Sequence, residues 1–102
     1  MSSSKEYLSF VLEQLSDLDG ISHRAMMGEY IIYYQGKVIG GIYDDRFLVK
    51  NTASAKRIMP DAPLELPYEG AKKMLLADID NRPLTAKLIR AVADDLPASK
   101  KR

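Results

Sequence analysis

Apolar residues recur every three or four positions near the start of the chain, which predicts an amphipathic helix. Its apolar stripe consists of Tyr7, Leu8, Val11, Leu12, Leu15 and Leu18. Ser3 and Glu6 have the spacing of a capping box, in which each side chain pairs with a free amide of the first turn. Because Gly20 suits a left-handed helix terminator, we expect the helix to end at Leu18 or Asp19.

The middle of the chain changes to short runs of β-branched and aromatic residues, which predicts strands. We expect them over residues 23–27, 29–34, 37–43 and 46–50. Gly28, Gln35-Gly36 and Asp44-Asp45 lie at the reversals. Connections this short allow only antiparallel hairpins, because a parallel return needs a crossover of about a dozen residues or more.

The second half of the chain mixes helical and loop patterns. Asn51 or Thr52 can cap a short helix over 53–59, and the three prolines of residues 60–67 predict an extended loop. Residues 72–78 suit a fifth strand, although 73–76 would also suit a helix.

A last helix is expected to begin at Asp80 or Asn81, with Pro83 in its first turn. Its apolar stripe runs to Leu96, and Pro97 ends it. The order α-β-β-β-β-α-β-α predicts an α+β fold of two layers, in which helices cover one face of an antiparallel sheet of about five strands. We expect one domain over residues 1–96 and a flexible basic tail over 97–102.

The two faces of the predicted sheet differ in character. With two-residue turns, Tyr34 pairs with Lys37 and Ile32 with Ile39. The expected core face comprises Ile31, Tyr33, Val38, Gly40, Ile42, Phe47 and Val49. The opposite face comprises Tyr30, Ile32, Tyr34, Lys37, Ile39, Gly41, Tyr43, Arg46, Leu48 and Lys50. A bulge in the Gln35-Gly36 turn or at Gly40-Gly41 would exchange the faces.

Three hypotheses concern that opposite face and its surroundings, beside the simpler one that its residues only pair across a solvated sheet. The first is a surface for a protein partner or a second copy, made by Tyr30, Tyr34, Lys37, Tyr43, Arg46 and Lys50. The second is a nucleic-acid accessory domain, since Lys37, Arg46, Lys50, Lys56 and Arg57 lie close in sequence and the tyrosines could stack bases. The third is a small-molecule or enzyme cleft between the proline-rich loop and the sheet, near Tyr68.

Composition excludes several chemistries. The 102 residues suffice for one domain, and the net charge of +1 hides a basic segment of net +3 over residues 35–59. With no cysteine, disulfides, thiolate metal sites and cysteine nucleophiles are excluded. No apolar run reaches a membrane-spanning length and the N-terminus lacks a secretory pattern, so we expect a cytoplasmic protein.

Residues that could carry catalysis have simpler explanations. His23, the one histidine, suits a strand edge, and Asp44-Asp45 suits a turn. Asp78, Asp80 and Asn81 resemble the start of a calcium loop, but Pro83 stands where that loop needs glycine, so helix capping explains them better. We therefore expect no enzyme activity, no cofactor and no metal.

Four short segments carry a family resemblance: residues 24–30 (RAMMGEY), 34–37 (YQGK), 42–44 (IYD) and 48–50 (LVK). Over about residues 5–96 the chain resembles the N-terminal domain of TfoX/Sxy, the bacterial competence regulator. Met27 stands where that family usually has Phe, and Glu29 where it often has Gly. Full-length regulators carry a second, helical domain beyond the region of resemblance.

The resemblance implies a stand-alone domain with a two-layer α+β fold, and a regulatory, protein-binding role without catalytic residues. It does not by itself transfer competence regulation. Three motif residues are expected to be structural. Gly28 would allow the reversal between strands, Met26 or Met27 would fill the layer between sheet and helices, and Arg24 would pair with an acidic residue.

Overall fold

The computed structural model describes residues 3–97, which form an α+β fold of three helices and one six-stranded antiparallel sheet. The strands lie in the order β1-β2-β3-β4-β6-β5. The elements are α1 (Lys5–Gln14), β1 (Ile21–Met26), β2 (Glu29–Tyr34), β3 (Lys37–Ile42), β4 (Phe47–Val49), α2 (Ala53–Ile58), β5 (Leu64–Glu65), β6 (Met74–Leu76) and α3 (Arg82–Asp95). The predicted fold class is confirmed, and residues 98–102 of the predicted tail lie outside the described range.

Helix α1 begins one residue later than the capping-box pattern predicts. Ser4 is the N-cap and its side chain accepts a hydrogen bond from the Tyr7 amide. Ser3 instead donates from Oγ to the Glu29 carboxylate at 2.6 Å. The predicted end at Leu18 or Asp19 is also wrong, because regular helix stops at Gln14 and turns lead on to Gly20.

The other element ends follow local chemistry more closely. Thr52 caps α2, and Asn81 caps α3 with a proline in its first turn, as predicted. Of the two alternatives for residues 72–78, the strand is observed, as β6. A strand within the proline-rich segment was not expected; β5 pairs with β6 there and raises the strand number to six.

Three hairpin turns have backbone in the left-handed region. Both central residues have positive φ in each turn: Met27 and Gly28 (54° and 86°), Gln35 and Gly36 (52° and 82°), Asp44 and Asp45 (55° and 56°). Positive φ at both positions matches the twist of a two-residue hairpin loop. The predicted reversals are therefore confirmed, although β1 begins at Ile21 rather than at His23.

The predicted register fails at one point in β3. Tyr34 pairs with Lys37 as expected, but Ile32 pairs with Gly40 rather than with Ile39, because a bulge inserts one extra residue. The faces of β2 are consequently exchanged relative to the prediction. Ile32 and Ile39 are fully buried under the helices, and Tyr30 and Tyr34 pack against the same core.

Three residues expected in the core lie outside it, namely Ile31, Tyr33 and Val38. The residues expected there from the far side of the bulge, Ile42, Phe47 and Val49, are fully buried as predicted. The core includes one side of each helix: Leu8 and Val11 of α1, with Leu15 directly after it, Ala55 of α2, and Leu88, Ile89, Val92 and Ala93 of α3. A single bulge thus accounts for a face assignment that is right in one half of the sheet and wrong in the other.

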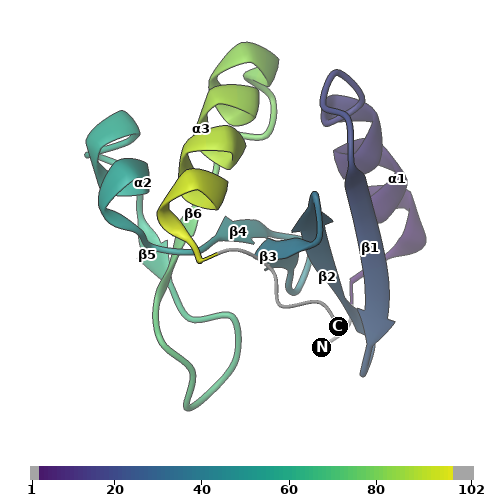
Figure 1. The fold of residues 1–102 in the computed structure, drawn as a ribbon. Helices are drawn as coiled ribbons and strands as arrows, with labels where there is room; N and C mark the ends of the chain where they lie inside the picture. The colour runs from purple at the N-terminus through teal and green to yellow at the C-terminus, as the bar shows by residue number, and fades with distance from the viewer. Residues whose placement is uncertain (1–2, 98–102) are drawn as a thin grey trace.

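Figure 1 shows α2 and α3 on one side of the sheet, while the segment between β5 and β6 extends to the other side. Two polar contacts hold the helical layer. Lys37 donates from Nζ to the Ala93 carbonyl at the end of α3, at 2.9 Å. Asp95 accepts from the amide and hydroxyl of Ser54 at the start of α2, at 2.8 and 2.9 Å.

Candidate functional site

The sheet face turned away from the core cluster, called the open face here, carries the partly buried side chains of Ile31, Tyr33 and Val38. Leu48 lies between two core residues of β4 and so belongs to this side, yet it is fully buried. Part of the open face is therefore covered. Pro67, in the segment between β5 and β6, is also buried. We call residues 66–73 of this segment the loop.

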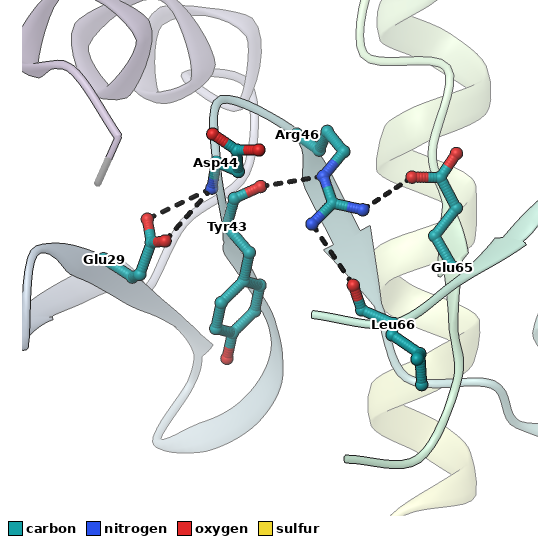
Figure 2. A network of polar contacts seen from close by, with 6 residues as sticks. All are labelled: Glu29, Tyr43, Asp44, Arg46, Glu65 and Leu66. Carbon is teal, nitrogen blue, oxygen red and sulfur yellow. Dashed lines mark hydrogen bonds and ion pairs between the residues drawn. The ribbon is translucent and has the colours of Figure 1, made fainter. Parts of the chain in front are cut away.

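Arg46 fixes the start of this loop. Figure 2 shows its guanidinium between the turn after β3 and the segment after β5. Nη1 lies 2.6 Å from Glu65 Oε1, Nη2 donates to the Leu66 carbonyl at 3.2 Å, and Nε donates to the Tyr43 carbonyl at 3.0 Å. A planar cation with a fork of donors suits this bridging position, because it can hold a carboxylate and two carbonyls together.

Tyr43 directly follows the last residue of β3, and its ring lies against Gly41 of that strand. A Cβ placed on Gly41 would lie 2.7 Å from Tyr43 Cε2, so the ring packs where a side chain at Gly41 would be. The ring of Tyr68 lies 6.2 Å away, tilted by 57°. Burial raises the pKa of Tyr43 above its ordinary value, and Tyr68 and Glu29 raise it further.

Two hollows flank these rings. The larger, about 810 Å³ and called the lysine groove here, is lined by Val38, Gly40, Tyr43, Lys50, Asn51, Thr52, Leu64, Pro67, Tyr68, Ala71, Lys72, Lys73 and Met74. The smaller, about 440 Å³ and called the methionine hollow, is lined by Met26, Met27, Glu29, Ile31, Tyr43, Pro67 and Tyr68. Tyr43, Pro67 and Tyr68 line both, so they form the partition between the two hollows.

The rim of the methionine hollow exposes large apolar side chains. Met27 is 95% exposed, Tyr68 64% and Met26 49%. Apolar exposure at a few neighbouring side chains around a concavity is typical of a binding surface.

Comparison with known proteins identifies the family. The family model for the TfoX N-terminal domain matches residues 13–87. The chain belongs to the TfoX N-terminal domain family. It is also 33% identical, over 100% of its length and 90% of the relative's, to an uncharacterized 12.7 kDa protein in the trpE 5′ region of Spirochaeta aurantia. No solved structure matches the chain.

This TfoX N-terminal domain brings together only some of the residues predicted to bind a partner. Tyr43 and Lys50 line the lysine groove, and Arg46 anchors the loop beside it. Tyr30, Tyr34 and Lys37 do not share that face, because the bulge places them on the helical side.

The motif residues of the TfoX N-terminal domain divide in the same way. Gly28 forms the expected reversal, with φ of 86°. The expectation that Met26 or Met27 fills the layer under the helices is wrong, since both are exposed. Arg24 is exposed on β1, and in residues 3–97 no ion pair joins it to a carboxylate.

The other candidates take structural positions in this domain. His23 lies on the edge strand β1, with its ring 6.2 Å from that of Tyr30. Asp44 and Asp45 form a turn, and Asn81 caps α3. Within residues 3–97 no cluster of three His, Asp or Glu side chains could hold a metal ion, and no helix is long and apolar enough to cross a membrane.

Several residues of the two hollows were not expected, among them Met26 and Met27 as exposed residues and Asn51, Lys72 and Lys73 as groove residues. The hypothesis of a cleft near Tyr68 located the groove correctly, because the proline-rich loop does face the sheet there. The adjacent lysines at 72 and 73 follow directly on that loop in sequence, and could have been assigned to the cleft on that ground.

Proposed function

We propose that this TfoX N-terminal domain is a non-enzymatic binding domain that engages a protein partner through the methionine hollow. The observation that carries the proposal is the position of Met27. It is 95% exposed in a turn whose two central residues both have positive φ. Such turns favour Asn-Gly, and a left-handed backbone costs about 1–2 kcal/mol for most side chains.

Met27 therefore departs from both the turn preference and the tendency of apolar side chains to be covered. Departures of this kind concentrate at functional sites. Methionine also suits a partner surface, because its unbranched and polarizable side chain adapts to different shapes. Met26, Ile31 and the Tyr43–Tyr68 partition supply the rest of an apolar pocket that a partner side chain could enter.

A binding role is supported further by the one ionisable carboxylate of the hollow. Glu29 accepts from Ser3 Oγ at 2.6 Å, and both of its oxygens accept from the Asp44 amide at 3.2 Å. These bonds hold Glu29, which directly follows the turn at Met27-Gly28, against the turn at Asp44-Asp45. Because both oxygens of Glu29 already accept hydrogen bonds, a structural role for Glu29 is favoured over a role as a free general base.

The nucleic-acid alternative receives less support from the basic residues of the middle segment. Lys37 binds the end of α3, Arg46 pairs with Glu65, and Arg57 donates to Ser54 Oγ at 2.9 Å. Of that sequence cluster, Lys50 is the member that lines the lysine groove. The charges are thus distributed over different parts of the fold instead of forming one track.

The test uses Met27→Asn, which should stabilise the turn while removing the exposed apolar side chain. Phe10→Gln is the matched control, because Phe10 is 38% exposed on α1, away from the hollow. Each immobilised protein is challenged with an extract of the native cell, and self-association of each is measured by sedimentation equilibrium. Phe10→Gln should retain the same partner as the unsubstituted domain, and Met27→Asn should lose it.

A captured protein, or the second copy, is then purified and titrated. We expect Met27→Asn to weaken its binding at least about tenfold, equivalent to about 1.4 kcal/mol. Thermal unfolding of Met27→Asn should be unchanged or occur at a higher temperature. If all three proteins retain the same partners and self-associate equally, the methionine hollow is not the binding surface.

A further inference from the structure

The lysine groove has one sign of charge. Lys50, Lys72 and Lys73 are among its lining residues, and none of those residues is acidic. Within residues 3–97 no ion pair joins these three lysines to a carboxylate. Glu65, on the neighbouring strand, is already paired with Arg46. A concave surface lined by three lysines and no acidic residue favours an anionic occupant.

One residue that lines the groove, Asn51, carries a buried acceptor without a donor. Asn51 Oδ1 is buried and has no hydrogen-bond partner within the described residues. A buried polar atom left in this state costs free energy that a suitable partner would recover. Because Asn51 lines the groove, an occupant with an N–H group could supply the missing donor.

The walls of the groove are apolar and aromatic. Tyr43 and Tyr68 form one side, and Pro67, Leu64 and Met74 contribute aliphatic surface. Tyr68 is 64% exposed, so much of its ring is available for contact. Rings of this kind can stack on the flat face of a heterocycle.

We propose that the lysine groove is a binding site for a nucleotide, with its phosphate on the lysines and an amino-substituted base between the tyrosines and Asn51. The groove of about 810 Å³ lies within the range of small-molecule sites, about 300–1,000 Å³. The proposal concerns a different hollow from the one assigned to the protein partner. The same chemistry could be presented by a free mononucleotide or by one unit of a single strand, and we commit to the mononucleotide because of this size.

The first experiment measures binding by titration calorimetry at low salt with five probes. Adenosine 5′-monophosphate contains the phosphate, the base and the amino group. Ribose 5-phosphate lacks the base, adenosine lacks the phosphate, and purine riboside 5′-monophosphate lacks only the amino group. A single-stranded tetra-adenylate is the fifth probe. We expect adenosine monophosphate to bind at least about tenfold more tightly than each of the three truncated probes.

The oligonucleotide separates the two sources. A site for a mononucleotide can take any one of the four nucleotides of tetra-adenylate. Its affinity for tetra-adenylate should therefore exceed its affinity for adenosine monophosphate by no more than this statistical factor of four. A strand-binding surface should instead show tighter binding, with a salt dependence that grows with the number of phosphates contacted. Clearly tighter binding of the oligonucleotide would overturn the mononucleotide assignment.

Two sets of variants locate the site. Lys72→Gln/Lys73→Gln removes two exposed groove charges, and Lys5→Gln/Lys87→Gln removes two exposed charges from helices. The first pair should weaken binding of adenosine monophosphate about tenfold or more, and the second should change it less than about twofold. Equal losses would mean that only net charge matters and would overturn the proposal.

Asn51→Ala tests the contact to the base. Adenosine monophosphate should bind this variant less tightly, whereas purine riboside monophosphate should bind it and the unsubstituted protein equally. Because the Asn51 oxygen has no partner to lose, the variant should fold normally, and circular dichroism checks this. Absence of binding of adenosine monophosphate at millimolar concentration, with all proteins folded, would also overturn the proposal.

Discussion

Replacing Arg46 by Met should release the loop from the sheet while leaving the core intact. The aliphatic part of Arg46 can be replaced by the methionine side chain, so the loss is mainly that of the guanidinium. Three contacts disappear: the ion pair with Glu65, and the bonds to the carbonyls of Tyr43 and Leu66. The side chains of Arg46 and Glu65 are 28% and 33% exposed, so water screens the pair only partly.

The expected magnitude follows from these contacts. A partly exposed ion pair contributes at most about 1 kcal/mol, and each net hydrogen bond contributes about 0.5–1.5 kcal/mol. Since water can solvate the freed carbonyls in part, we expect Arg46→Met to lower the free energy of unfolding by about 2 kcal/mol. At roughly 4–8 °C per kcal/mol for a domain of this size, the melting temperature should fall by roughly 10 °C.

Urea denaturation followed by far-ultraviolet circular dichroism measures the free energy of unfolding. The slope of this free energy against urea concentration should be the same in Arg46→Met and the unsubstituted domain. Amide hydrogen exchange measures the loop directly. The Ala71 amide, which donates to the Tyr68 carbonyl, should exchange faster in Arg46→Met. The exchange rates of the α3 amides should change only by the amount that the change in global stability predicts.

Glu65→Gln is the matched control, because it removes the charge but keeps an acceptor. It should cost less than about 1 kcal/mol, and the double variant should show coupling between the two positions. A change below about 0.5 kcal/mol in Arg46→Met, with unaltered exchange in the loop, would refute the anchoring role of Arg46.

Two further predictions concern the helical layer. Lys37→Met should lower the free energy of unfolding by about 1 kcal/mol in urea, because a cation that donates to the Ala93 carbonyl is lost from the end of α3; no change would contradict this. The Ser54 amide, and then the hydroxyls of Thr52 and Ser54, lower the pKa of Asp95 below its ordinary 3.8. Its stabilisation is therefore present above about pH 4 and is lost as the pH falls through the folded pKa. Asp95→Asn should melt earlier than the unsubstituted domain at neutral pH and approach it in acid, whereas a difference independent of pH would contradict this.

The sequence predicts those features of the fold that local chemistry decides. Gln35-Gly36 and Asp44-Asp45 form the expected turns, and Asn81 caps α3, because Gly36, the two aspartates and Asn81 favour the backbone that these positions require. The start of α1 was displaced by one residue because Ser3 and Ser4 are chemically equal as caps. Glu29, distant in sequence, engages Ser3 and leaves Ser4 as the cap.

The candidate site was less predictable because it depends on contacts between distant segments. Strand β5 has only two residues, so no alternation of apolar and polar positions marks it in the sequence. It forms because it pairs with β6. The position of Pro67 and Tyr68 over the sheet then depends on Arg46, about twenty residues earlier. No local pattern in the proline-rich segment specifies this arrangement.

The bulge in β3 connects the fold to the site. Inserting Ile39 as an extra residue brings both Ile39 and Ile42 under the helices, which turns Ile31, Tyr33 and Val38 outward. The adjacent Gly41 then presents no side chain to the open face. A Cβ there would lie 2.7 Å from both the Tyr30 carbonyl oxygen and the ring of Tyr43, so glycine is what allows that ring to lie against the sheet. Because the same ring separates the lysine groove from the methionine hollow, the irregular strand that exchanges the faces also positions the partition between the two proposed binding sites.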